Sequence, residues 1–138
     1  MSTGVAQGAV ELRQLFERFA VLSEAAVRAC DAGDAAALTA ALDARDLLTP
    51  RTAELTSAFS AARRSAATRA SREAIDVALR PVQAAAVVAG QLNVQLSQRA
   101  QAARSAIGAQ LDRLRQDESA TSAYAHARGE TSFLDVTR

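Results

Sequence analysis

Apolar side chains recur every three or four positions over most of the chain, which is the period of a helix with one buried face. One such stripe runs from residue 5 to residue 31 and predicts a first helix, with Leu12, Leu15, Phe16, Phe19, Leu22, Ala26 and Cys30 on the stripe. Gly33 is expected to end this helix, because glycine readily adopts the left-handed conformation that closes a helix. Asp34 can then cap a second, antiparallel helix with its carboxylate.

The second stripe continues to residue 59 and consists of Leu38, Leu42, Arg45, Leu48, Leu55 and Phe59. Pro50 interrupts it, because proline has no amide hydrogen and clashes with the preceding turn. We favour a bent but continuous rod; the alternative is a restart with Thr49 as the cap and Pro50 in the first turn. Residues 61–72 carry no large apolar side chain, so we place the second turn there, with Thr68 or Ser71 capping the next helix.

A third, long helix is predicted from Arg72 to Asp117. Its slowly drifting stripe contains Ile75, Leu79, Val82, Val88, Leu92, Leu96, Ile107, Leu111 and Leu114. Pro81 and Gly90 weaken this helix, and small residues at Ala85, Ala89, Ala100 and Ala103 would let another helix approach closely. The helical period fails after Asp117. We therefore expect a helical domain over residues 1–117 and a flexible tail over residues 118–138.

Composition supports an all-α fold. Alanine supplies 35 of the 138 residues, whereas Gly at 6 and Pro at 2 are too few for the many tight turns of a sandwich or barrel. We expect an antiparallel bundle of three or four helices, or a long helical hairpin, followed by the flexible C-terminal tail.

Charge and chemistry exclude several classes of function. The 16 basic residues, all arginine, are interspersed with 15 acids, so neither a nucleic-acid surface nor a polybasic membrane patch is expected. The most apolar run, residues 84–89, is too short for membrane insertion, and a cytoplasmic protein is expected. Cys30 lies on an apolar stripe, and the single histidine, His126, lies in the tail. We therefore expect no enzyme, no metal site and no cofactor.

Three amphipathic helices of unequal length cover one another only in part. The uncovered part of the longest helix would favour formation of a homodimer or capture of another protein's amphipathic helix. Alternatively, kinks at Pro50 and Pro81 fold the chain into a self-contained four-helix bundle that needs no partner. Periodicity alone does not separate these cases.

Two stretches resemble flagellar export chaperones of the FlgN/FliT type, with the FlgN-like branch favoured. The first is Ala32-Gly33-Asp34 followed by Leu38, Leu42, Arg45-Asp46 and Leu47-Leu48. The second is a long last helix with an asparagine, here Asn93, and then Tyr124, Gly129 and Ser132-Phe133-Leu134-Asp135 in the order found in that family. Together they span most of the chain.

The resemblance implies a non-enzymatic, ATP-independent cytoplasmic chaperone. Its partners would be hook-filament junction proteins or the filament cap, bound through their C-terminal helical region, and the export gate. The substrate would cover the stripe formed by Val88, Leu92, Leu96, Ile107, Leu111 and Leu114. Tyr124 would contact the export gate; the alternative is that it docks on its own bundle. A structural or adaptor bundle that self-associates through the same stripe is the alternative function.

Overall fold

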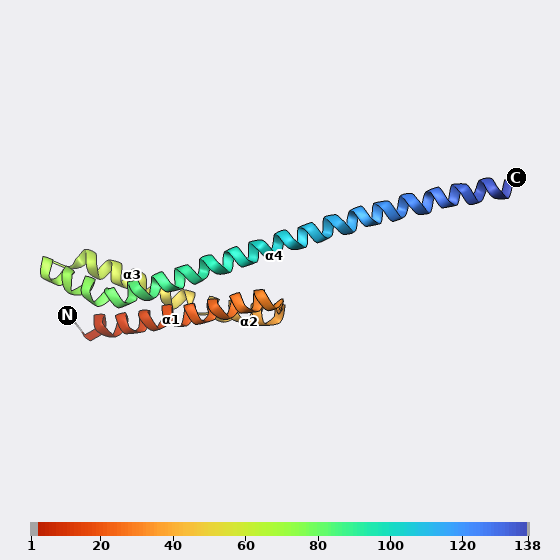
Figure 1. The fold of residues 1–138 in the computed structure, drawn as a ribbon. Helices are drawn as coiled ribbons and strands as arrows, with labels where there is room; N and C mark the ends of the chain where they lie inside the picture. Colours follow the sequence, from red (N-terminus) through yellow and green to blue (C-terminus); the bar gives the residue numbers. More distant parts are fainter. Residues whose placement is uncertain (1–2, 138) are drawn as a thin grey trace. The chain divides into compact units, whose positions relative to one another are not determined.

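The computed structural model describes the backbone of residues 3–137 and the side chains of residues 4–127. This part of the chain contains four helices and no strand, which confirms the all-α expectation (Figure 1). The helices are α1 (Thr3–Ala32), α2 (Ala35–Asp46), α3 (Thr49–Ser65) and α4 (Arg69–Thr137). The chain divides into two compact units, Met1–Ala100 and Gln101–Arg138, and α4 contributes to both. Among the described residues, no helix is long and apolar enough to cross a membrane.

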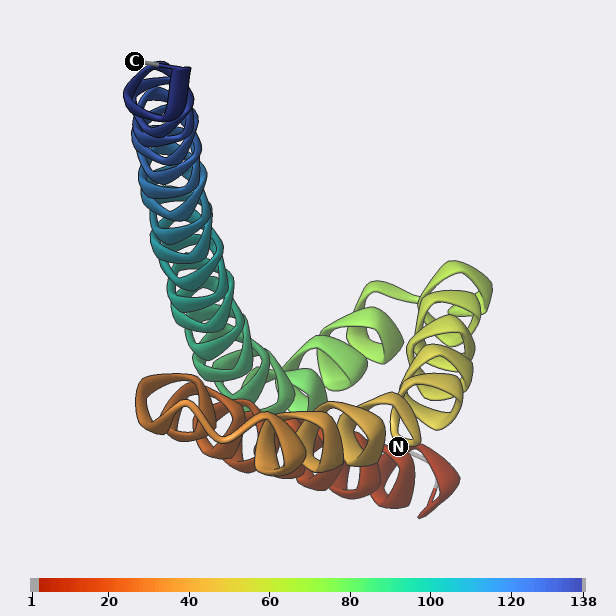
Figure 2. The same cartoon turned by 90° about the vertical axis from the view of Figure 1, so that its right-hand side faces the viewer.

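The turn between α1 and α2 forms as the sequence predicts. Gly33 has a φ of 67°, and its N–H donates to the carbonyl of Cys30 at 3.2 Å. The Asp34 N–H reaches back to the carbonyl of Ala29 at 2.9 Å, which completes a glycine-closed helix end. Asp34 then caps α2, because its carboxylate accepts a hydrogen bond from the Ala37 N–H at 3.0 Å. As a result α1 and α2 lie side by side (Figure 2).

The chain bends before Pro50, as expected, but the helix is interrupted there and not continuous. Two residues, Leu47 and Leu48, separate α2 from α3. Pro50 lies in the first turn of α3, where its missing N–H leaves no helical bond unmade. Thr49 is not the cap; Leu48 holds that position without a side-chain hydrogen bond, and Figure 2 shows α3 leaving the direction of α2.

The connection between α3 and α4 confirms Thr68 as the cap of the long helix. The Thr68 hydroxyl accepts a hydrogen bond from the Ser71 N–H at 3.1 Å, and α4 begins at Arg69. Pro81 lies inside α4 without ending it. The helix end predicted at Asp117 is wrong, because α4 continues to Thr137. Small and straight side chains in this stretch tolerate a helix even where no apolar stripe is present. The flexibility of residues 118–138 stays a prediction.

The first unit has two buried clusters, and α1 runs through both. One cluster joins the beginning of α1 to α3 and to the first turns of α4 through Ala9, Leu12, Leu55, Phe59, Ile75 and Val82. The other joins the end of α1 to α2 and to α4 through Ala26, Val27, Ala41 and Leu96. The stretch of α4 between Val82 and Leu96 faces the middle of α1, and the next subsection concerns this region.

Candidate protein-binding groove

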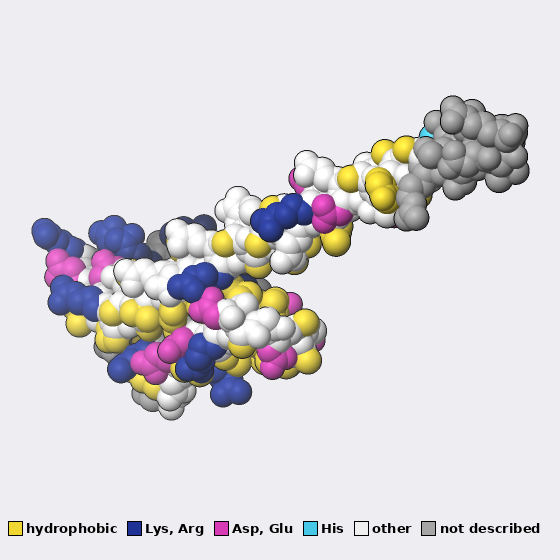
Figure 3. Space-filling view, turned by 45° about the vertical axis from the view of Figure 1, so that its right-hand side comes forward, with side chains coloured by type: hydrophobic (Ala, Val, Ile, Leu, Met, Phe, Trp, Pro, Cys, Tyr) yellow, Lys and Arg dark blue, Asp and Glu magenta, His cyan; other side chains and the backbone are white. Residues whose placement is uncertain are grey.

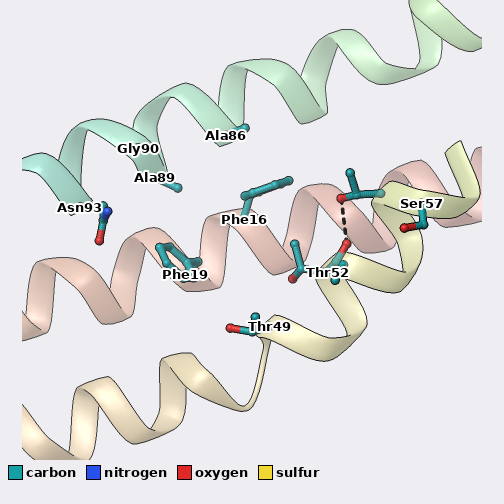
Figure 4. Close-up of a pocket in the computed structure, with 11 residues that line it drawn as sticks. Phe16, Phe19, Thr49, Thr52, Ser57, Ala86, Ala89, Gly90 and Asn93 are labelled. Atoms are coloured by element: carbon teal, nitrogen blue, oxygen red, sulfur yellow. Dashed lines mark hydrogen bonds between the residues drawn. The ribbon is translucent and has the colours of Figure 1, made fainter. Parts of the chain in front are cut away.

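An open apolar groove of about 530 Å³ lies in the first unit between α1, α3 and α4 (Figure 4). Its volume falls in the usual range for ligand sites. Eleven residues line it, and none of them is charged: Phe16, Phe19, Thr49, Thr52, Ala53, Thr56, Ser57, Ala86, Ala89, Gly90 and Asn93.

The groove exists because α4 brings only small side chains to this level of the bundle. Ala86, Ala89 and Gly90 line it, whereas Val82 and Leu96 at either end of the same stretch reach the two buried clusters. A Cβ atom added to Gly90 would meet nothing within 4 Å. The space above Phe16 and Phe19 is therefore left open instead of being filled by α4.

The α3 wall is less polar than its sequence suggests. The Thr52 hydroxyl donates to the carbonyl of Leu48 at 2.8 Å. The Thr56 hydroxyl donates to the carbonyl of Thr52, also at 2.8 Å, and Figure 4 marks this second bond. Since these hydroxyl protons bond to the helix backbone, the two threonines offer no free donor to a ligand. The wall also contains Thr49 and Ser57, so polar groups remain available at two of its positions.

A polar cluster lies at the Asn93 end of the groove. Arg45 of α2 donates from Nη1 to the Asn93 Oδ1 at 3.0 Å and to the Ser23 hydroxyl at 3.3 Å. Its guanidinium carbon lies 4.6 Å from the centroid of the Phe19 ring, within the range of a cation–π contact. Ser23 is fully buried, and Arg45 supplies a hydrogen-bond partner that such a group requires. The cluster thus connects α1, α2 and α4.

Ion pairs join the helices elsewhere in this unit. Arg99 of α4 contacts both carboxylate oxygens of Asp31, at 2.7 and 2.8 Å, and Arg63 contacts Asp76 at 2.9 Å. Arg51 pairs with Glu11 at 2.6 Å. Figure 3 shows charged side chains of both signs next to each other over this unit, with apolar side chains between them.

Two of these pairs shift the pKa of a carboxyl group. The hydrogen bond from Arg51 lowers the pKa of Glu11 below its ordinary value, and the hydrogen bond from Arg63 does the same for the pKa of Asp76. The same bonds raise the pKa of Arg51 and the pKa of Arg63. Both pairs are well exposed to solvent, so they orient helices more than they stabilise them.

The structure divides the six predicted substrate-binding residues among three environments. Leu96 is 7% exposed and belongs to the second buried cluster, and Leu92 is partly buried. Leu96 is not part of an uncovered stripe, because α1 and α2 already cover it; its role in substrate binding stays a prediction. Val88 is 50% exposed and lines a second groove, between α1 and α4, together with Val21 and Pro81.

The other three predicted residues lie in the second unit. Ile107, Leu111 and Leu114 are 57%, 48% and 62% exposed. They follow one another at steps of four and three, so they form one stripe on a helix. The described part of this unit is a single helical segment of α4, which provides no second element to cover the stripe.

The predicted gate contact, Tyr124, also lies in the second unit, and its side chain is well exposed. The remaining residues of the C-terminal resemblance, Gly129 and Ser132-Phe133-Leu134-Asp135, have side chains outside the described residues. The N-terminal resemblance has a clear structural role: Asp34 caps α2, and Leu38 and Leu42 pack against the second cluster. Arg45 and Asn93, one from each resembling stretch, are hydrogen-bonded to each other.

Sequence reasoning missed the groove, although it singled out some of the residues that form it. Phe16 and Phe19 were assigned to a buried stripe, and small residues such as Ala85 and Ala89 were expected to allow close helix approach. Instead Ala89 is buried beside an open space and Ala85 lines the second groove. The available signal was the mismatch in size between two phenylalanines and the small residues at 84–86, 89 and 90 of α4.

The cysteine and the possible metal ligands were the other candidates for a chemical site. Cys30 is partly buried and packs against the second cluster, as a small apolar side chain does. Among the described residues, no group of three or more His, Cys, Asp and Glu side chains is placed to hold a metal ion. Comparison of the chain with protein families, with curated proteins and with solved structures finds no match.

Proposed function

We propose that this protein is a cytoplasmic, non-enzymatic chaperone of flagellar export substrates, either hook-filament junction proteins or the filament cap. It binds their C-terminal helical region, prevents premature assembly and delivers them to the export gate. The observation that carries the proposal is the uncharged groove lined by Phe16 and Phe19. An open apolar groove between helices is the kind of surface that accepts an amphipathic helix.

Two further observations support the proposal. The stripe of Ile107, Leu111 and Leu114 is a second apolar surface, exposed and without a covering element among the described residues of its unit. In addition, the hydrogen bond between Arg45 and Asn93 connects the two stretches that resemble the chaperone family. A helical substrate that would otherwise self-assemble can bury its apolar face on these surfaces, so that chaperone binding competes with assembly.

The test is co-expression of the chain with the C-terminal segments of junction and cap proteins from the same organism, followed by size-exclusion chromatography with light scattering. We expect a stoichiometric complex with one segment. Gly90→Leu places a bulky side chain at the groove and should abolish the complex, whereas Gly90→Ala should leave it intact. Failure of every segment to bind the wild-type chain would overturn the proposal.

A second pair of variants assigns the roles within the complex. Replacement of both Leu111 and Leu114 by Asp should weaken substrate binding if the stripe takes part, and the exposed positions of both residues leave the first unit folded. Tyr124→Ala should spare substrate binding and weaken binding to the export gate. Loss of substrate binding in Tyr124→Ala would contradict the gate role.

The same exposed stripe favours one alternative, a structural or adaptor bundle that self-associates. Such a protein would elute as a homo-oligomer of fixed mass, and the double Asp variant at Leu111 and Leu114 would convert it to a monomer. It would form no complex with any of the flagellar segments.

A further inference from the structure

Arg45 differs from the other arginines that connect helices of the first unit. Arg51, Arg63 and Arg99 each contact a carboxylate on another helix, at distances between 2.6 and 2.9 Å. The interhelix contacts of Arg45 are with a hydroxyl, an amide oxygen and an aromatic ring. Within the part of the chain that the structure describes, no carboxylate lies within ion-pair distance of Arg45.

These neutral contacts hold the guanidinium in place without neutralising it. Nη1 is bonded to both Ser23 and Asn93, and the guanidinium carbon lies over the Phe19 ring. The remaining N–H groups of the guanidinium make no hydrogen bond to the described residues. A planar guanidinium fixed in this way is prepared for a carboxylate, which it can bind with two parallel hydrogen bonds.

The guanidinium of Arg45 lies next to the groove. Phe19 and Asn93 both contact Arg45 and both line the groove. The lining itself carries no charge, so Arg45 provides a cation in direct contact with two residues of the groove wall. The arrangement is an apolar surface with one positive group at its end.

We propose that Arg45 is the anion anchor of the groove. The partner is an amphipathic helix that lays its apolar stripe on Phe16 and Phe19 and presents an Asp or Glu, about one turn beyond the stripe, to the free side of the guanidinium. The carboxylate sets the direction and register of the bound helix, because Arg45 lies at the Asn93 end of the groove. The nature of the ligand as a substrate helix rests on the proposed function.

The probe is a pair of synthetic helical peptides that differ at one position. Both carry leucines at positions i, i+4 and i+7, and one has Glu at i+11 where the other has Gln. We expect calorimetric titration of the full-length protein to show about tenfold tighter binding of the Glu peptide, with a difference that shrinks as salt is added. In Arg45→Gln the two peptides should bind equally.

Matched variants separate the specific role of Arg45 from the loss of any positive charge and from loss of folding. Arg99→Gln removes the same charge from the same unit and should keep the preference for Glu. Arg45→Lys keeps the charge and should keep part of the preference for Glu. It is the variant to titrate if Arg45→Gln lowers the melting temperature too far for titration. Circular dichroism melting establishes which variants are folded.

Four results would overturn the anchor. The first is that Arg45→Gln keeps the preference for the Glu peptide. Equal binding of the Glu and Gln peptides by the wild-type protein would also do so, as would failure of both peptides to bind. The fourth is a wild-type dimer that Arg45→Gln dissociates, since a second copy would then be the occupant. Any of these can occur while flagellar segments still form a complex, so failure of the anchor is distinguishable from failure of the proposed function.

Discussion

The two parts of α4, before and after Ala100, carry the same kind of apolar stripe but differ in how far that stripe is buried. In the first unit Ile75, Val82 and Leu96 are at most 7% exposed, because α1, α2 and α3 cover them. In the second unit Ile107, Leu111 and Leu114 are about half exposed or more. By the 3.6-residue period, Leu96, Ile107 and Leu114 fall on one stripe of the helix. Periodicity therefore identifies the apolar face of a helix, but it does not show whether another part of the chain covers that face.

The largest expected effect comes from truncating a leucine to alanine in each of the two parts of α4. Leu96→Ala should lower the free energy of unfolding by about 2–4 kcal/mol, because it leaves a cavity between α1, α2 and α4. Leu114→Ala should change it by less than about 0.5 kcal/mol, because its side chain is well exposed. Urea denaturation followed by circular dichroism measures both. Equal losses would mean that Leu114 also has a partner inside the folded chain.

Gly90 and Gly108 of α4 provide a second test of the difference between the two units, with a smaller expected effect. Gly90→Ala should raise the free energy of unfolding of the first unit by about 0.5–1 kcal/mol, since alanine favours the helix and its Cβ would meet nothing within 4 Å. Gly108→Ala has equally free space but should slow amide hydrogen exchange only among its neighbours in the second unit. Exchange measured by mass spectrometry distinguishes these outcomes. Protection that spreads from position 108 into the two buried clusters would contradict the separation of the units.

The smallest expected effect is on the pH dependence of the first unit. The pKa of Asp76 is lowered in the folded protein by Arg63, so the pair stabilises the fold above the ordinary carboxyl pKa of about 4. This contribution is lost as the pH falls through the lowered folded value. Asp76→Asn should therefore flatten the pH profile of the melting temperature below about pH 4. Glu11→Gln should act in the same direction through its pair with Arg51, and an unchanged profile in both variants would exclude these pairs as its source.

Much of the fold follows from local sequence. The turn at Gly33 and Asp34 was predicted correctly, and the cap at Thr68 is one of the two candidates predicted for α4. Each depends on backbone angles and hydrogen bonds within a few residues. Two local predictions needed correction. Pro50 interrupts the helix where a continuous rod was favoured, and α4 continues past Asp117, where the absence of an apolar stripe removes a packing face but not the preference for a helix.

Less of the candidate site could be predicted from local sequence. The sequence identified the apolar stripe of α4 but not its division into a covered and an uncovered part. It also placed Phe16 and Phe19 correctly on one face of α1, yet the groove beside them depends on the small residues that α4 brings to the same level. Asn93 and Arg45 are 48 positions apart in the chain, and no local pattern indicates that they are hydrogen-bonded.

Short-range propensity and period thus set the helical class, the position of the first turn and the faces along which the helices pack. Which of those faces are covered depends on how the helices pack against one another. This packing placed Leu96 in the core, left Ala86, Ala89 and Gly90 beside an open groove, and gave Arg45 neutral partners at the end of that groove. These outcomes depend on which side chains from distant parts of the chain arrive at the same level of the bundle, and side-chain size and charge at that level decide whether the space is filled.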